Sequence, residues 1–325
     1  MKTIAILAFD KLFDSSLTVT LDILTSARRI HENFCGGTVQ VKTLIYGIDK
    51  DHLSTAHGLK IKVDANINAH QKLDIVIVPG LGITNPTVLE ELLTTKTAKK
   101  AIGFLTGQHK SGAIITASCS ATFLLAEAGL FDNQPATTSW WLSDAFRGRY
   151  PNINLQSERM LISGSRLICA GAAMAQADLM MAVVAQVYGE ETARLTASYL
   201  LIDRRELQSQ YIMSGLMTHR HPEVAKAESW IRENIAVDFT ISDIATVVGL
   251  SPRTLGRRIT EIVGVGPLKF VQQLRIEHAI HLLETTQRSF EAIAIDVGYQ
   301  DASSLRRLLK RQTGKSPSQF RSSSV

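Results

Sequence analysis

A cysteine flanked by small residues could supply a nucleophile near the middle of this chain. Cys119 lies within Ala117-Ser118-Cys119-Ser120-Ala121, between an apolar run and a segment with helical periodicity. This is the layout of a nucleophile elbow, in which a strand turns sharply into a helix and presents the reactive atom. The helix dipole at such a position favours the thiolate. The alternative interpretation is a buried free cysteine that packs as a small hydrophobic residue.

A second set of reactive groups, arginines at helical spacing, recurs in the last hundred residues. The segment 244–249 repeats as 293–298, with the same isoleucine, alanine, valine and glycine 49 positions later. Each copy continues into a second amphipathic segment with paired arginines. A short apolar helix, a glycine turn and a second helix form a helix-turn-helix unit. Arginine pairs bidentately with guanine in the major groove, so two such units in tandem predict contact with DNA.

The elements that must position Cys119 alternate between short apolar runs and longer amphipathic segments. The pattern predicts strands over 3–9, 39–46, 73–78 and 112–117, and helices over 17–30, 88–108 and 121–128. Such alternation predicts an α/β domain with an open, mostly parallel, flavodoxin-like sheet covered by helices on both faces. Ligands of these sheets bind beyond the carboxyl ends of the strands, which here means the loops 79–82 and 118–120.

From residue 190 onward the pattern is helical. One helix is expected from Glu191 to about Tyr211, and a linker at about 212–222. All-α structure follows, with helices over 223–234 and 268–284, the two helix-turn-helix units, and a short helix over 316–321. The predicted domains are therefore 1–190, a helix and linker over 191–222, and 223–325.

The second helix of each repeat begins and packs in a way that the residue types predict. Ser251 and Asp301 are typical N-cap residues, and Pro252 suits the first helical position. The residues expected to face inward are Leu255, Ile259 and Ile262 in the first copy and Leu305, Leu308 and Leu309 in the second. The residues expected to face outward or lie at the edge are Arg253, Gly256, Arg257, Thr260, Ser303, Arg306, Arg307 and Lys310.

Composition restricts the class of protein. The formal net charge is +5, and residues 218–325 hold 15 Lys and Arg against 11 Asp and Glu, the basic surplus expected of a phosphate-binding module. Three widely separated cysteines argue against a disulfide framework and for a reduced, cytoplasmic setting. No cofactor or metal is expected. Polar residues interrupt the apolar stretch 167–187, which is therefore not expected to span a membrane.

Residues 223–323 resemble the DNA-binding domains of the AraC/XylS family. The segments that carry this resemblance are 244–255, Gly264-Val265-Gly266-Pro267, 293–299 and Thr313-Gly314-Lys315-Ser316-Pro317. The resemblance implies sequence-specific binding to double-stranded promoter DNA. The implied base contacts are Arg253, Gly256, Arg257, Ser303, Arg306 and Arg307. Leu305 and Leu309 replace aromatic residues that are usual in the second recognition helix.

The segment Cys119–Leu130, with 136–140, resembles the class I glutamine-amidotransferase-like domain of the ThiJ/PfpI type. In the GlxA group of regulators such a domain precedes an AraC-type domain, and that architecture covers almost the entire chain. Enzymes of the superfamily place a histidine base after the elbow. Ser139 stands at that position here, and no histidine occurs between Cys119 and His219. Ser16 stands where these folds tend to supply an acidic residue, so the elbow is expected to be catalytically dead.

The elbow still predicts a binding site. Free backbone N–H groups at a helix start suit a carboxylate or similar anion. The residues expected to form a small-metabolite pocket are Ser16, Gly80, Leu81, Cys119, Ser120, Ser139 and Trp140.

The expected function is a cytoplasmic transcription factor, an activator or a repressor, that senses a metabolite. Its expected partners are promoter DNA, an effector, a second copy of the chain in a homodimer, and RNA polymerase. The alternative is a thiol-dependent amidase or protease that uses Cys119. A third reading gives the N-terminal domain a dimerising role alone.

Overall fold

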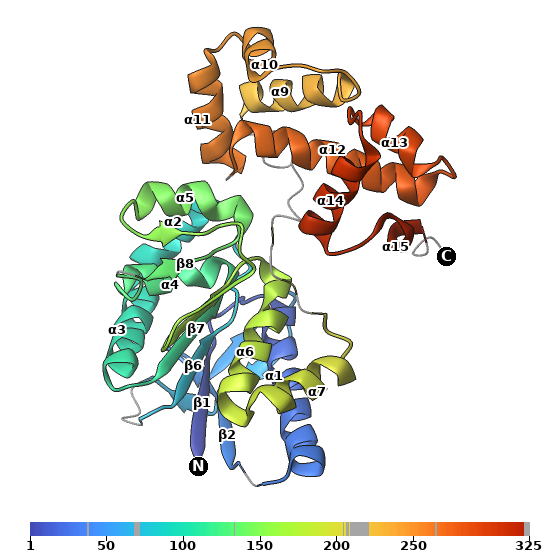
Figure 1. Ribbon diagram of the computed structural model, residues 1–325. Coiled ribbons are helices and arrows are strands. Elements are labelled where there is room, and N and C mark those ends of the chain that lie inside the picture. Colours follow the sequence, from blue (N-terminus) through green and yellow to red (C-terminus); the bar gives the residue numbers. More distant parts are fainter. Residues whose placement is uncertain are drawn as a thin grey trace. The chain divides into compact units, whose positions relative to one another are not determined.

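The chain forms two compact units, Met1–Ser209 and Gln210–Val325. The computed structural model in Figure 1 describes residues 1–37, 39–67, 72–132, 134–203, 205, 208, 221–263 and 265–321. The linker expected at about 212–222 lies, but for its last two residues, outside the described residues.

A seven-stranded sheet forms the centre of the first unit (Figure 1). Its order is β10-β11-β7-β6-β1-β2-β5, and only β10 runs antiparallel to its neighbour. The strands are β1 (Lys2–Leu7), β2 (Val41–Gly47), β5 (Ala65–Asn66), β6 (Ile75–Val78), β7 (Ile114–Ser118), β10 (Leu161–Ser163) and β11 (Leu167–Ala170). Two small sheets pair β3 (His52–Ser54) with β4 (Lys60–Lys62) and β8 (Pro135–Ala136) with β9 (Asn154–Leu155).

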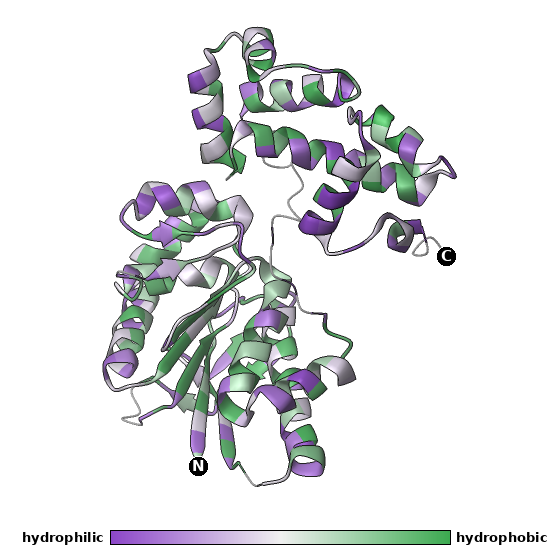
Figure 2. Cartoon of the chain, in the orientation of Figure 1, coloured by the Kyte–Doolittle hydropathy of each residue, from purple (hydrophilic) through white to green (hydrophobic). Residues whose placement is uncertain are grey.

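The alternation of side chains along β6 explains why helices cover both faces of the sheet. All four residues of β6 are buried. Val76 and Val78 belong to the hydrophobic cluster on one face, whereas Ile75 and Ile77 belong to the cluster on the other. A strand buried on both faces reads as a continuous apolar run, as this one does. Figure 2 shows the apolar strands in green and mixed colours on the helices around them.

Seven α-helices belong to the described part of this unit. They are α1 (Asp14–Ile30), α2 (Pro86–Thr94), α3 (Lys96–Lys110), α4 (Thr122–Glu127), α5 (Ser143–Arg149), α6 (Gln176–Tyr188) and α7 (Glu190–Tyr199). Short 3₁₀ or π segments lie at His31–Cys35, Cys119–Ala121, Trp140–Leu142 and Ala173–Ala175. α3 and α4 pack on one face of the sheet, and α1 and α6 on the other.

The expected fold class is confirmed, and two helix predictions are wrong. The helix expected over 88–108 is two helices, because Thr95 adopts an extended conformation and its hydroxyl accepts a hydrogen bond from the Ala98 amide, which caps α3. The helix expected from Glu191 to about Tyr211 ends at Tyr199. Leu201, with φ +54°, leaves the helical region two residues later.

The second unit is helical in its described residues (Figure 1). Its helices are α9 (Pro222–Glu233), α10 (Ile241–Val248), α11 (Pro252–Val263), α12 (Pro267–Thr285), α13 (Phe290–Asp296), α14 (Ala302–Thr313) and α15 (Pro317–Arg321). α12 connects the two helix-turn-helix units. With 19 residues it is roughly 28 Å long at 1.5 Å per residue.

Candidate functional site

The first helix-turn-helix has the caps that its sequence requires. The Thr240 hydroxyl accepts from the Asp243 amide, and the Asp243 carboxylate accepts from the Thr240 amide, which completes a capping box. Gly249, with φ +71°, ends α10 in the left-handed conformation that glycine adopts most easily. The Ser251 hydroxyl then accepts from the Thr254 amide at 3.1 Å, which confirms Ser251 as the N-cap of α11.

The two faces of α11 are as expected. Leu255, Ile259 and Ile262 are buried, whereas Arg253, Arg257 and Thr260 are exposed. Gly256 is half-buried, and a β-carbon there would lie 3.5 Å from Cγ of Pro267. Such a distance is an ordinary van der Waals contact, so the packing of α11 against α12 does not itself require glycine at this position.

The second helix-turn-helix repeats this construction. Gly298, with φ +78°, makes the turn after α13. The Asp301 carboxylate accepts from the amides of Ser303 at 2.9 Å and Ser304 at 3.0 Å, which confirms it as the N-cap of α14. Leu305, Leu308 and Leu309 are buried, and the exposed residues of this helix include Ser303, Arg306, Arg307 and Lys310.

The arginines of the two recognition helices differ in their intramolecular contacts. Arg306 lies over the ring of Phe290, 5.2 Å from its centre, and 4.0 Å from the carboxylate of Glu291. Both charges of that ion pair are largely exposed, so the pair contributes little and Arg306 can turn towards a ligand. Arg258 instead forms an ion pair with Glu223 of α9, which makes it part of the support of α11.

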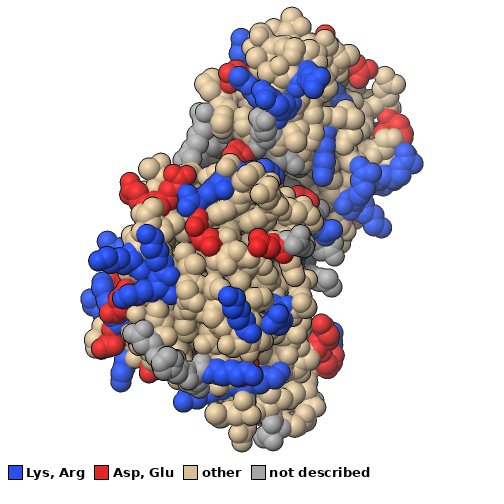
Figure 3. Space-filling model, turned by 90° about the vertical axis from the view of Figure 1, so that its left-hand side faces the viewer, with Lys and Arg blue, Asp and Glu red and all other residues tan. Residues whose placement is uncertain are grey.

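Lys and Arg side chains gather on the helical unit in the face shown in Figure 3. Two exposed helices with basic residues, carried by a rigid connecting helix, match what the major groove of DNA requires. The six predicted base-contacting residues lie on these two helices, α11 and α14.

The cysteine turn in the first unit has elbow geometry. Cys119 directly follows β7 and has φ +56°, a left-handed conformation that is strained for any residue except glycine. Its amide donates to the Gly171 carbonyl at 2.8 Å, which fixes the turn against the end of β11. The sequence prediction of a strand-to-helix elbow is therefore confirmed.

The thiol of Cys119 is buried in surroundings that disfavour its thiolate form. Only 3% of Cys119 is exposed, and burial raises the pKa of its thiol, although hydrogen bonds from Ser139 and Ser120 oppose that shift. The Ser139 hydroxyl lies 3.1 Å from the sulfur. A serine hydroxyl cannot take a proton at neutral pH as an imidazole does, so this pair lacks a base.

Residues that the sequence analysis assigned to a pocket converge on Cys119. A β-carbon at Gly80 would lie 3.1 Å from Cβ of Cys119 and 3.1 Å from Oγ of Ser16. Ser16 is fully buried, and its hydroxyl has no hydrogen-bond partner within the part of the chain that the structure describes. Ser120 and Ser139 are also fully buried, and Leu81 and Trp140 are at least nine-tenths buried. Ser16, Gly80 and Ser139 therefore lie together at Cys119, in a cluster that is closed in this structure.

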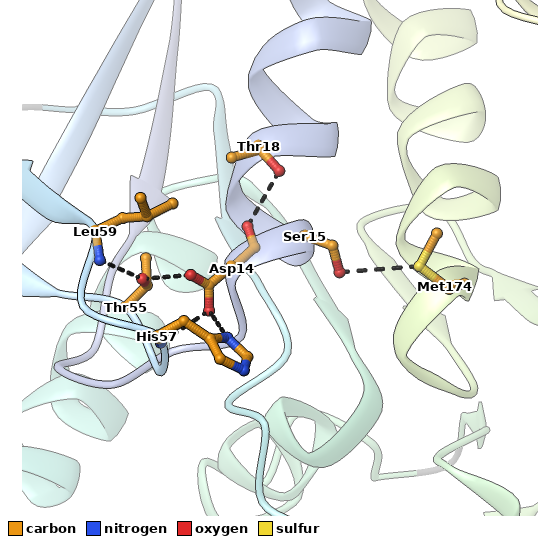
Figure 4. Close-up of polar contacts among 7 residues, drawn as sticks. All are labelled: Asp14, Ser15, Thr18, Thr55, His57, Leu59 and Met174. Carbon is orange, nitrogen blue, oxygen red and sulfur yellow. Dashed lines mark hydrogen bonds and ion pairs between the residues drawn. The ribbon is translucent and has the colours of Figure 1, made fainter.

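Two histidines of this unit, His57 and His109, lie away from Cys119. His57 points its Nδ1 at the carboxylate of Asp14, 2.8 Å away, and most of its side chain is exposed (Figure 4). Asp14 also accepts from the Thr55 hydroxyl at 2.6 Å. His109 precedes β7, whereas Cys119 follows it, so a strand of five residues, roughly 17 Å long, separates them. Among the described residues, no hydrogen bond joins a histidine to Cys119.

Sequence reasoning missed a buried polar chain behind the elbow. The Ser118 hydroxyl donates to the side-chain oxygen of Gln176 at 2.5 Å, and the amide nitrogen of Gln176 donates to the Thr20 hydroxyl at 2.7 Å. Thr20 in turn donates to the carbonyl of Ser16. The sequence contained a signal for this chain of hydrogen bonds, because Gln176 is a polar residue within an apolar stretch. That residue was used only as an argument against a membrane-spanning segment.

Gln208 was also missed. This residue is 1% exposed, and its amide nitrogen donates to the carbonyls of Thr138 and Ser157, both at 2.8 Å. The hydroxyl of Thr138 lies 3.2 Å from the carbonyl oxygen of Cys119. A side chain on Gly171 would collide with the Gln208 amide. The segment after α7 is thereby attached beside the elbow.

Another candidate site lies beside two helices of the first unit. A surface groove of about 1170 Å³ lies beside α6 and α7, and its lining includes Asp178, Arg194 and Arg205. Within the described ranges, no group of three or more His, Cys, Asp or Glu side chains could hold a metal ion. The helices that could be searched are too short or too polar to cross a membrane.

Comparison with known protein families matches both units. The sequence model of the DJ-1/PfpI family matches residues 2–186, which is more than half of the chain. A helix-turn-helix domain model matches residues 244–323.

Curated relatives have the same combination over much of their length. The chain is 26% identical over 205 residues to the HTH-type transcriptional regulator GlxA of Rhizobium meliloti, covering 62% of this chain and 63% of the relative, a little under two thirds. It is 26% identical over 284 residues to the HTH-type transcriptional regulator CdhR of Pseudomonas aeruginosa, covering 85% of this chain and 80% of the relative.

Solved structures share the fold. An AraC family transcriptional regulator from Pseudomonas putida superposes with a TM-score of 0.51 at 16% identity, covering 62% of this chain and 100% of that one. DJ-1beta of Drosophila melanogaster gives a TM-score of 0.50 at 16% identity, covering 62% and 99%.

Proposed function

This chain belongs to the DJ-1/PfpI family and carries an AraC-type helix-turn-helix domain, and from that premise we propose how it acts. It is a DNA-binding transcriptional regulator. In the proposal, residues 1–190 sense and dimerise, 191–222 connect, and 223–325 bind promoter DNA in the cytoplasm. The observation that carries the proposal is the pair of exposed arginine faces on α11 and α14, joined through α12.

The base contacts are proposed residue by residue. Arg253, Arg257, Arg306 and Arg307 face solvent on helices whose opposite sides are buried, so these side chains can enter a groove. Exposed Ser303 lies at the start of α14, and Gly256 has no side chain to hold α11 away from the groove. Phosphate contacts by the surrounding basic residues would supply most of the non-specific affinity.

The experiment is a binding titration with fragments of the chain's own genomic promoters at several salt concentrations. We expect the logarithm of affinity to fall linearly with the logarithm of salt, with a slope of about −0.9 for each phosphate contacted. Failure to bind any genomic fragment, or binding that salt does not weaken, would refute the proposal.

The N-terminal unit is proposed to bind a small anionic metabolite at the Cys119 cluster, after opening of that cluster. Support comes from the buried Ser16 hydroxyl that lacks a partner among the described residues. The proposal also includes that the chain forms a homodimer and contacts RNA polymerase, as is expected from the architecture of this group of regulators. A ligand that changed DNA affinity in the wild type but not in Ser16→Ala would support the cluster as the effector site.

The second candidate function is thiol-dependent hydrolysis, which the left-handed backbone of Cys119 favours. Burial, the raised pKa of the thiol and Ser139 in place of a base argue against it. Hydrolysis of amide or ester substrates that disappears in Cys119→Ser would restore this function.

A further inference from the structure

A single arginine on α12 joins the two helix-turn-helix units. The guanidinium of Arg275 donates from Nη2 to the carbonyl of Val237 at 3.1 Å, in the loop that precedes α10. Its central carbon lies 5.4 Å from the centre of the Phe239 ring in the same loop. It lies 5.6 Å from the centre of the Tyr299 ring, in the turn between α13 and α14. One side chain thus contacts a loop of each unit.

The backbone closes around this guanidinium. Gly298 has φ +78°, and a β-carbon there would lie 2.6 Å from the carbonyl oxygen of Ile235 and 2.7 Å from Nη2 of Arg275. Only glycine fits so close an approach. The turn of the second helix-turn-helix therefore lies directly against the loop that leads into the first.

The loop on the first side is itself fixed. Phe239 packs edge-on against Trp230 of α9, with ring centres 5.2 Å apart. Tyr299 is half-buried, and its ring packs against the hydrophobic cluster of the second helix-turn-helix. Arg275 therefore contacts two aromatic rings. One ring packs beside the first helix-turn-helix, and the other packs within the second.

The contacts of Arg275 with Val237, Phe239 and Tyr299 can determine the spacing of the two recognition helices. α12 alone would fix the distance between its ends, but α11 and α14 reach it through turns that allow rotation. A planar guanidinium that contacts two aromatic rings restrains the rotation of the segments that carry those rings. A lysine ammonium lacks the plane and the fork of donors.

We propose that Arg275 is a positioning residue that fixes the separation and relative orientation of α11 and α14, and so selects the spacing between the two groups of bases that the chain recognises. This inference rests on the proposed function. One turn of B-DNA is about 34 Å for about 10 base pairs, so one extra base pair shifts a half-site by roughly 3.4 Å and rotates it by roughly 36°. If the contacts of Arg275 hold α11 and α14 rigidly, the two helices cannot adjust to such a change in the DNA site. If those contacts are weakened, the helices can adjust.

The test uses the full-length protein and a series of DNA sites. In this series the two base groups found by footprinting are moved apart or together by one and two base pairs. The wild type should lose about tenfold or more in affinity for a one-base-pair change, comparable to a mismatched contact. Arg275→Lys should flatten this profile to within about threefold, while affinity for a site with only one base group stays unchanged. Tyr299→Phe keeps the ring and should retain the wild-type profile.

A second measurement does not use DNA. Spin labels at Thr260→Cys on α11 and Lys310→Cys on α14, both exposed positions, report the distance between the recognition helices. Cys35→Ser removes the one free cysteine that is not buried. The distance distribution should be narrow with the native Arg275, and broader with Arg275→Lys at an unchanged thermal unfolding temperature.

The outcomes separate the inference from the proposed function. An unchanged spacing profile in Arg275→Lys, or an equal loss of affinity at every spacing, would overturn the inference and leave DNA binding intact. Absence of promoter binding by the folded wild type would refute the proposed function, and the inference would fall with it.

Discussion

The hydroxyl of Ser139 lies 3.1 Å from the sulfur of Cys119, on a turn whose backbone is held in a left-handed conformation. The turn thus keeps the shape of a nucleophile elbow while the residue beside the thiol has no basic nitrogen. The strained backbone of Cys119 is therefore retained beside a side chain that cannot act as a base.

Cys119 should be unreactive in the folded protein. Burial excludes the alkylating agent and raises the pKa of the thiol, so the thiolate population at pH 8 is small. We expect iodoacetamide to modify partly exposed Cys35 at least about tenfold faster than Cys119, as measured by peptide mass spectrometry. In denaturant, all three cysteines should react at similar rates. Fast modification of Cys119 under native conditions would contradict a closed cluster.

Gly80→Ala should overfill the Cys119 cluster. The added methyl group would lie 3.1 Å from both Cβ of Cys119 and Oγ of Ser16, where neither neighbour is exposed. We expect a loss of about 1–3 kcal/mol in the free energy of unfolding of the N-terminal unit, measured by chemical denaturation. Gly103→Ala in α3, where the added carbon meets no atom within 4 Å, is the matched control and should not destabilise.

The Cys169 thiol should make the free energy of unfolding decrease as the pH rises above about 9. Burial raises its pKa from 9.0 to about 12. Above about pH 9 the unfolded chain releases this proton and the folded protein keeps it, so stability falls as pH rises. The difference in unfolding free energy between the wild type and Cys169→Ala should shrink by about 1.4 kcal/mol per pH unit between pH 9 and 12. A constant difference across that window would show that the thiol ionises equally in both states.

Arg257→Ala and Arg306→Ala should relax specificity at separate base positions. Each lost bidentate contact costs about 1–3 kcal/mol of discrimination, which binding to operators with single base changes would reveal. Arg258→Ala is the contrast, because Arg258 pairs with Glu223 and supports α11 from behind. It should change the base preference little. Identical effects of all three substitutions would argue against base reading by Arg257 and Arg306.

Asp301→Ala should weaken the start of α14. The Asp301 carboxylate accepts two backbone amides there, and loss of such an N-cap costs about 0.5–2 kcal/mol. Asp301→Asn keeps an acceptor and should retain most of the stability. Thermal unfolding followed by circular dichroism measures both, and equal melting temperatures of Asp301→Ala and the wild type would rule out a capping role.

The second unit was predicted from sequence almost to the residue, because local chemistry determines it. Ser251 and Asp301 cap the helices that they were expected to cap, and the leucines at helical spacing are buried. Such signals act over three or four residues. The contacts of Arg275 with Phe239 and Tyr299 join segments far apart in the chain, and no local pattern marks them.

The first unit was predicted at the level of its sheet and its elbow. The break at Thr95 was missed, since threonine in an amphipathic stretch gives no strong stop signal and its capping role depends on backbone geometry. Gln176 and Gln208 were missed for a different reason. Their partners lie on other elements, and only the assembled fold reveals that these amides fill buried polar positions.

The attachment of Gln208 to Thr138 and Ser157 has a consequence for exchanging domains between regulators. A fusion that cut this chain at residue 190 would remove α7 and the amide that satisfies those carbonyls, and would leave buried acceptors exposed to water. Arg205, whose guanidinium donates to Asp178 at 2.5 Å, would be lost with it. An exchange of the N-terminal unit should therefore include the chain at least to residue 208, so that the donor side chains are transferred together with the carbonyls and the carboxylate that accept from them.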